Sequence, residues 1–202
     1  MSDIVRKNGA HAVYGGVSVD IAEEGLDRVT QLLAGLRGGA YKAMGSALAR
    51  AANSGKTVAK REASKKYTIS QGEFVAQTKN INHFVHSGSA LSVVFGYRGH
   101  VVPLIKFDTK FGADGRVHTR VLRSSAQEVL NHAFVVRMGG HTGVFEREGP
   151  ERFPVRELYG PATPQMMYSD EETMDKIEAQ IVETYEKRIS HEIDVVLNGW
   201  RR

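Results

Sequence analysis

The amino-acid sequence predicts an α+β fold, in which an antiparallel sheet of about five strands packs against long helices. Two observations carry this prediction. Apolar residues recur every three or four positions near both ends of the chain, which is the period of an amphipathic helix. Between these ends, short runs rich in valine, phenylalanine, isoleucine and leucine are separated by glycine and turn residues, which is typical of strands. We therefore expect residues 1–202 to form a single domain.

The elements expected before the sheet are a short strand and three helices. Alternating valine and isoleucine predict a strand over Gly16–Ile21, and helical spacing of leucines predicts a helix over Glu23–Leu36. A second helix, rich in small residues, is expected from Ala40 to about Lys66. Ser70 followed by Glu73 is a capping box, which predicts a short helix that ends near Lys79.

The sheet itself is expected to be an antiparallel meander. Its strands are predicted at Asn82–Val85, Ala90–Tyr97, Val101–Phe107, Arg116–Leu122 and Val129–Met138. Asp114-Gly115 is a favourable hairpin tip, and the long approach to it predicts a protruding hairpin near residues 108–116. We expect this hairpin to contact a partner.

The last element expected is a long helix from about Asp170 to Leu197, with Ser169 and Glu172 at its cap. One face of this helix is apolar throughout. The residues of that face are Met174, Ile177, Ile181, Tyr185, Ile189, Ile193 and Val196.

The composition narrows the chemistry that this chain can perform. The sequence contains no cysteine, which excludes disulfides, thiolate catalysis and cysteine-type zinc sites. Its apolar runs are far shorter than a membrane span, and the amino-terminal residues lack the apolar core of a signal peptide. We expect a soluble protein made in the cytoplasm, with no membrane partner.

The net charge of +4 is unevenly distributed. Between Arg37 and Lys66 most charged residues are basic, and Glu62 is the single acid. The residues expected on the exposed side of this helix, where they could touch DNA phosphates without reading bases, are Lys42, Arg50, Lys56 and Lys60. A non-specific nucleic-acid-binding protein that uses the basic helix 42–66 is therefore the alternative function. A merely solvated basic face is the simpler interpretation of the same residues.

The sequence offers no convincing catalytic set. Ser54-Gly55-Lys56-Thr57 matches the end of a phosphate-binding P-loop, but Arg50 stands where the motif needs its first glycine, and the segment is helical in pattern. The histidines lack the spacing of metal ligands, and no serine occupies a nucleophile elbow. We expect no enzymatic activity, no catalytic residue, no metal and no cofactor.

Residues 139–167 combine aromatic rings, arginines, glycines and prolines. Such a segment is too polar for a core and too aromatic for a spacer, and proline stiffens its backbone. We predict an extended arm that binds another protein at low ordering cost. The residues expected in this contact are Phe145, Arg147, Arg152, Phe153, Pro154, Leu158 and Tyr159. The alternative is a long loop folded over its own domain.

Several blocks of the chain occur in a characteristic order. They are the alanine-rich segment Tyr41–Asn53, Ala59-Lys-Arg61-Glu62, Tyr67-Thr-Ile69-Ser70, Ala133-Phe134, Gly140-His141-x-Gly143-Val-Phe145-x-Arg147-x-Gly149, Arg152-x-Pro154-Val155 and Leu158-Tyr159-Gly160-Pro161. Over roughly Leu26 to Ile193, this pattern resembles the minor tail protein Z family of tailed phages and prophages.

The resemblance implies a structural virion protein made in the host bacterial cytoplasm. Such a protein would be a minor tail or tail-completion subunit at the head-proximal end of the tail, acting in tail completion and head–tail joining. The related neck folds pack a long helix on a small sheet and assemble as rings. The expected partners are therefore other copies of this chain, with a hexamer expected from tail symmetry, together with other tail and neck proteins and, through non-specific contact, phage DNA.

Overall fold

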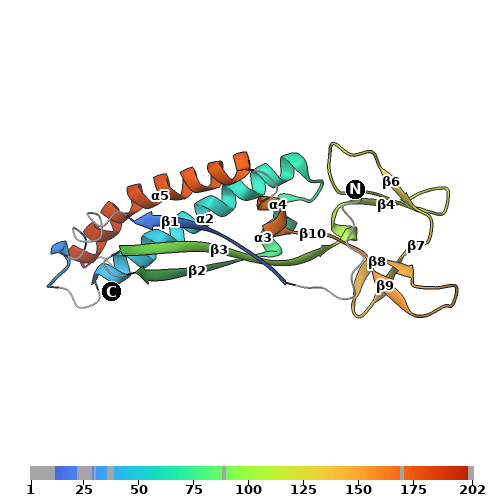
Figure 1. The fold of residues 1–202 in the computed structure, drawn as a ribbon, viewed down its shortest axis with the longest axis horizontal. Coiled ribbons are helices and arrows are strands. Elements are labelled where there is room, and N and C mark those ends of the chain that lie inside the picture. The colour runs from blue at the N-terminus through green and yellow to red at the C-terminus, as the bar shows by residue number, and fades with distance from the viewer. Residues whose placement is uncertain are drawn as a thin grey trace. The chain divides into compact units, whose positions relative to one another are not determined.

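The computed structural model describes residues 12–21, 29, 31–35, 39–87, 90–168 and 171–199 (Figure 1). Their mixture of helix and strand confirms the α+β class. The elements, in chain order, are β1 (Ala12–Ile21), α2 (Gly39–Lys66), α3 (Gln71–Ala76), β2 (Thr78–Ser87), β3 (Ala90–Pro103), a 3-10 turn (Leu104–Lys106), β4 (Asp108–Phe111), β5 (Val117–Arg120), β6 (Glu128–Leu130), β7 (Ala133–Met138), β8 (His141–Arg147), β9 (Val155–Glu157), β10 (Tyr159–Ala162), α4 (Thr163–Met167) and α5 (Glu171–Leu197).

The strands of the described residues form three small sheets, so the prediction of one meander of about five strands is wrong. One sheet has the order β1-β3-β10, with β2 also paired to β3, and the others have the orders β4-β5-β6 and β7-β8-β9. The expected strand at 101–107 is instead the end of β3 followed by the 3-10 turn. The expected strand at 129–138 is interrupted at Asn131-His132, where the chain leaves β6 for β7 and enters a different sheet.

The chain divides into two compact units. The described residues of the first unit are 12–14, 60–79 and 98–168, and those of the second are 15–21, 29, 31–35, 39–59, 80–97 and 171–199. Both α2 and β3 contribute residues to each unit. Whether the whole chain folds as a single domain stays a prediction.

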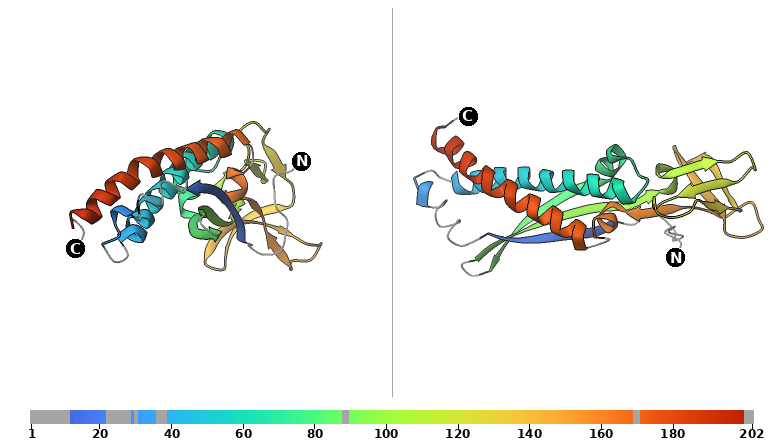
Figure 2. Two further views of the ribbon diagram at one scale, coloured as in Figure 1. Left: turned by 60° about the vertical axis from the view of Figure 1, so that its left-hand side comes forward. Right: turned by 90° about the horizontal axis from the view of Figure 1, so that it is seen from above.

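The second unit is built on the contact between α2 and α5, which run antiparallel beside each other (Figure 2). A Cβ added to Gly55 would lie 2.6 Å from Cγ1 of Ile181, so the absence of a side chain at Gly55 lets the two helices approach closely. On β3, the hydroxyl of Tyr97 donates to the carbonyl of Ala52 at 3.2 Å. This unit also has a buried apolar cluster, which contains Val29, Leu33, Ala43, Met44 and Ile193.

These two helices were predictable from their periodicity. The expected bounds of Ala40–Lys66 and Asp170–Leu197 agree closely with α2 and α5. Ile177 and Ile181 of the predicted apolar face are almost completely buried, and Ile189 and Val196 pack against the apolar cluster. The strand expected at residues 16–21 is part of β1. The helix expected over residues 23–36 lies largely outside the described residues.

In the first unit, the carboxyl end of α2 is capped by a side chain from a distant part of the sequence. The guanidinium of Arg123 donates from Nε to the carbonyl oxygens of Ser64, at 2.9 Å, and Tyr67, at 3.1 Å. A cation at this position satisfies carbonyl groups that the helix leaves without partners and interacts favourably with the helix dipole. The next helix, α3, starts as predicted, with Ser70 accepting a hydrogen bond from the backbone of Glu73 at 3.2 Å.

The segment 139–167 is folded, so the prediction of an extended arm is wrong. It supplies β8, β9, β10 and α4. In its middle, the backbone N–H of Leu158 donates to Val144 at 2.8 Å, and its carbonyl accepts from Leu104 at 3.0 Å. The alternative, a segment packed on its own domain, describes it better.

Candidate protein-interaction surface

Hydrogen bonds within the loop between β8 and β9 hold the loop in one shape. Arg147 and Val155 are paired at the base of the loop, and the N–H of Glu148 donates to the carbonyl of Pro154 at 3.1 Å. Across the loop, Nη1 of Arg147 donates to the carbonyl of Arg152 at 3.0 Å. These bonds fix the loop before any partner arrives, which reduces the ordering cost of binding.

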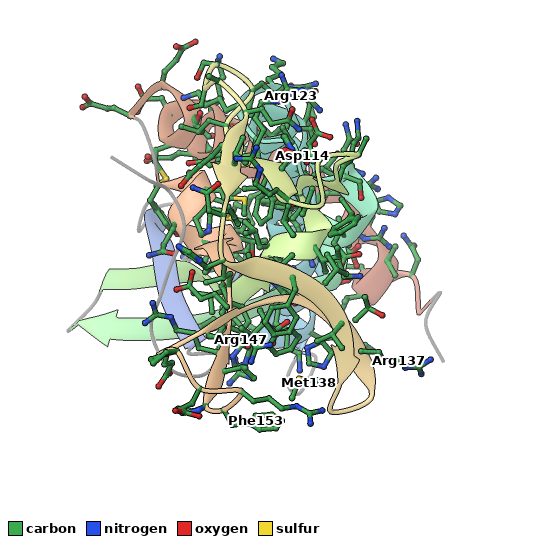
Figure 3. The ribbon with its side chains drawn as sticks, turned by 90° about the vertical axis from the view of Figure 1, so that its right-hand side faces the viewer. Asp114, Arg123, Arg137, Met138, Arg147 and Phe153 are labelled. Carbon is green, nitrogen blue, oxygen red and sulfur yellow. The ribbon has the colours of Figure 1, made fainter. Side chains whose placement is uncertain are left out.

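This fixed loop exposes an aromatic ring and two guanidinium groups. The side chain of Phe153 is 60% exposed, and the guanidinium carbon of Arg152 lies 5.6 Å from the centre of its ring. At the end of β8, where the loop begins, the guanidinium carbon of Arg147 lies 5.6 Å from the centre of the Phe134 ring on β7. Figure 3 shows Phe153 at the outside of the loop and Arg147 near it. We call Arg147, Arg152, Phe153 and Pro154, which are all exposed, the loop surface.

A shallow hollow of about 700 Å³ adjoins the loop surface. It contains charged groups of both signs, including Arg147, Glu148 and the ion pair in which Nε of Arg156 donates to Glu146 at 2.7 Å. Arginine and aromatic side chains next to such a hollow are the residue types enriched where proteins bind each other. The arrangement can receive polar side chains of another protein.

Three of the seven residues predicted for the interaction are buried and cannot act as exposed anchors. They are Phe145, Leu158 and Tyr159. Phe145 lies in the buried middle of β8, and Leu158 and Tyr159 lie where the chain passes from β9 into β10, a stretch that is buried from Leu158 to Gly160. The other four predicted residues form the loop surface.

A hydrogen-bonded chain of polar groups that joins β8, β9 and β10 was not expected from the sequence. One oxygen of Glu157 is 2.9 Å from Nε2 of His141, and the other accepts from the hydroxyl of Tyr159 at 2.7 Å. The bare backbone of Gly143 makes room for the Glu157 carboxylate. The spacing Gly-His-x-Gly was visible in the sequence, but its partner Glu157 comes from β9, and only the β8–β9 register brings the groups together.

Burial, and then the hydrogen bond to Glu157, raise the pKa of Tyr159 to about 12. Because this pKa is raised above the usual value of 10.0, the tyrosine contributes stability that is complete below pH 10 and is lost as the pH rises through about 12.

We expect Tyr159→Phe to lower the free energy of unfolding by about 1.5–3 kcal/mol at neutral pH, because a hydrogen bond to a carboxylate is lost. The difference from the wild type should shrink between pH 10 and pH 12, where the wild type loses the contribution of its neutral tyrosine. Urea unfolding of both proteins over this pH range measures it. A constant difference across the range would contradict the assignment.

The hairpin predicted near residues 108–116 is present as β4 and β5, which pair from Asp108↔Arg120 to Phe111↔Val117. Its turn contains Gly115 at a φ of 75°, a conformation that suits glycine. The hydrogen bond from Arg120 holds the pKa of Asp108 below its usual value. Phe111 is 65% exposed on this hairpin, and Asp114 near the tip is labelled in Figure 3. That the hairpin contacts a partner stays a prediction.

The predicted DNA-facing residues of α2 have different surroundings. Lys42 and Arg50 are exposed, and Nε of Arg50 donates to the buried carboxylate of Glu192 at 3.0 Å. Lys56 is half-buried, and this burial lowers its pKa. Lys60 is also half-buried and belongs to the first unit, whereas the other three belong to the second. Contact between these four residues and DNA stays a prediction.

Comparisons with known proteins give no guide to the chemistry, since no family model, curated protein or solved structure matches this chain. Within the residues that the structure describes, histidine, aspartate and glutamate side chains do not gather in a group that could hold a metal ion. None of the described helices is long and apolar enough to cross a membrane.

Proposed function

We propose that this chain is a structural protein of a tailed phage, a minor tail or tail-completion subunit that acts at the tail–head junction in tail completion and head–tail joining. Its partners are further copies of itself in a ring, with a hexamer expected from tail symmetry, and other tail and neck proteins. It is made in the host bacterial cytoplasm and resides at the head-proximal end of the tail in the virion. In this role it binds neighbouring subunits and catalyses no reaction.

One observation carries the proposal that the chain works by binding proteins, namely the loop surface. Its backbone is fixed by the bonds from Arg147 to Arg152 and from Glu148 to Pro154. Phe153 is therefore presented to a neighbour without a large loss of loop entropy. Aromatic residues and arginine are both enriched where proteins bind each other. The assignment to a phage tail rests on the sequence resemblance.

The test is the double substitution Arg152→Ala with Phe153→Ala. We expect the purified variant to keep the circular dichroism spectrum and urea midpoint of the wild type, because both side chains are exposed. It should fail to form the ring, as sized by light scattering. In a phage that lacks its own copy of the gene, the variant should yield tails without heads.

Val75→Ala with Lys79→Ala is the matched control. It removes one exposed apolar group and one cation from the same unit, away from the loop surface. The control should assemble and restore infectious particles. Normal particles from the Arg152→Ala, Phe153→Ala variant would reject the loop surface, and absence of the wild-type chain from purified virions would reject the phage role itself.

A further inference from the structure

A second hollow lies within the second unit, between α2 and α5, and all seven residues that line it are of polar type. It measures about 570 Å³. The residues that line it are Arg50, Asn53, Ser54, Thr57, Thr184, Lys187 and Arg188. We call it the basic hollow, because it has three cations, three hydroxyls and one amide but no carboxylate in its lining.

The sequence spacing of these residues explains how they meet. On α2 they follow the pattern i, i+3, i+4 and i+7, and on α5 the pattern i, i+3 and i+4, so each helix turns one stripe of polar groups towards the hollow. The close contact of Gly55 with Ile181 sets the distance between the helices. Ser54 and Thr184 are half-buried and the other five lining residues are exposed, so the two stripes meet at the solvent-facing surface of the helix pair.

Several of the lining groups are held in place. Nε of Arg50 is bound to Glu192, whose side chain is almost completely buried. The hydroxyl of Thr184 donates to that of Ser54 at 2.9 Å, joining the two helices, and the hydroxyl of Thr57 donates to the carbonyl of Asn53 at 3.0 Å. These bonds give the hollow a defined shape before a ligand binds, which lowers the ordering cost of binding.

The cations of the basic hollow retain free hydrogen-bonding capacity. Arg50 uses Nε for Glu192, so the donors on its two outer guanidinium nitrogens can bind an anion. Arg188 is exposed and forms no ion pair with any residue that the structure describes. Lys187 pairs with Glu183 one turn away, but both are well exposed, and such pairs contribute little. Two guanidinium groups and one ammonium group can therefore turn to an anion.

We propose that the basic hollow binds phosphate groups. Guanidinium groups bind phosphate oxygens in pairs, and the hydroxyl of Ser54, which accepts from Thr184 and keeps its own proton, adds a neutral donor. The phosphates belong either to a nucleic-acid backbone or to a small anion such as pyrophosphate. This site is distinct from the loop surface, which lies in the other unit, and does not depend on the proposed role in assembly.

The test compares two double variants of the full chain. Lys187→Gln with Arg188→Gln removes two cations of the basic hollow. Arg137→Gln with Lys176→Gln removes one exposed arginine and one exposed lysine that do not line it. Both variants lose the same net charge, so a difference between them reports position. Circular dichroism checks that both are folded.

Binding is measured with a fluorescent random duplex at ~0.05 and ~0.2 M salt, and with inorganic pyrophosphate by calorimetry. We expect the hollow variant to bind at least about tenfold more weakly than the wild type to the probe that the wild type prefers. If that probe is the duplex, the salt slope should also fall by about 2, the number of phosphate contacts removed. The control variant should stay within about twofold of the wild type.

The probes also identify the source of the phosphate. Tight duplex binding that pyrophosphate fails to displace assigns the site to a nucleic-acid backbone, whereas displacement at equal phosphate concentration assigns it to a small anion. Equal losses in the two variants would overturn the proposal, since charge alone would then account for binding. Failure of the wild type to bind either probe would overturn it as well.

Discussion

Gly55→Val is expected to lower the free energy of unfolding by about 1–3 kcal/mol, the usual cost of an overpacked core. The added Cβ alone would lie 2.6 Å and 2.8 Å from two carbons of Ile181 and 2.9 Å from the hydroxyl of Tyr97. Ile181 is fully buried and Tyr97 is held by its bond to Ala52. Relief of the clash therefore requires α5 to move away from α2, and this movement weakens the core of the second unit.

Gly45→Val is the matched control, because a Cβ at Gly45 of the same helix meets nothing within 4 Å. The control should be as stable as the wild type or slightly more so, since glycine is a poor helix former. Urea unfolding followed by circular dichroism measures both variants. If Gly55→Val proves no less stable than Gly45→Val, Gly55 has no packing role.

This comparison also separates two interpretations of Ser54-Gly55-Lys56-Thr57. A phosphate-binding P-loop would need Gly55 for the path of a loop, whereas here the residue is inside α2 and faces another helix. Ser54 and Thr57 nevertheless line the basic hollow. The segment therefore resembles a P-loop in residue types but not in backbone conformation. The hydroxyls of Ser54 and Thr57 nevertheless lie where an anion could reach them.

The sequence predicts the helices better than the sheets. The physical reason is the separation along the chain of the residues that specify each kind of element. A helix is specified by residues three and four positions apart, so the stripe containing Ile177, Ile181 and Ile193 was sufficient to place α5. The sheet order depends on pairings between distant segments, such as Val101 with Ala162. No local sequence pattern predicts that β3 ends beside β10 or that β7 starts a new sheet.

The incorrect arm has a similar cause. The mixture of charged, aromatic and proline residues predicts an exposed segment, but charged and apolar residues also occur together in a strand: β8 buries Val144 and Phe145 and leaves Arg147 exposed. The charges that made the segment look exposed are satisfied across the sheet, where Glu146 binds Arg156 and His141 binds Glu157. Once these pairs form, such a strand can lie against the core at little electrostatic cost.

The candidate sites show the same division between local and distant information. Arg152 and Phe153 could be selected from the sequence because they are adjacent in the chain and contact each other. The basic hollow could not, because Arg50 and Arg188 come from helices far apart in the chain. Each helix shows its polar stripe in the sequence, but only the packing of α2 against α5 turns the two stripes into one site.

Leu158→Ala is expected to be among the most damaging single substitutions in the first unit, with a loss of about 2–5 kcal/mol in the free energy of unfolding. The side chain is completely buried, and the backbone on both sides is bonded to Val144 and Leu104. Truncation therefore removes apolar contacts and leaves a cavity that the fixed backbone cannot close. The loss should appear as a lower urea midpoint with an unchanged slope.

Phe153→Ala should behave in the opposite way, although the sequence predicts that Leu158 and Phe153 belong to one protein contact. Its ring is 60% exposed, so the free energy of unfolding should change by no more than about 0.5 kcal/mol. The loss should appear instead in assembly, measured by light scattering at a temperature where both proteins are folded. A stable Leu158→Ala protein that failed to assemble would restore the extended arm and remove Leu158 from the core. An unstable Leu158→Ala protein beside a stable, unassembled Phe153→Ala protein would separate the residues that build the first unit from those it presents to a neighbour.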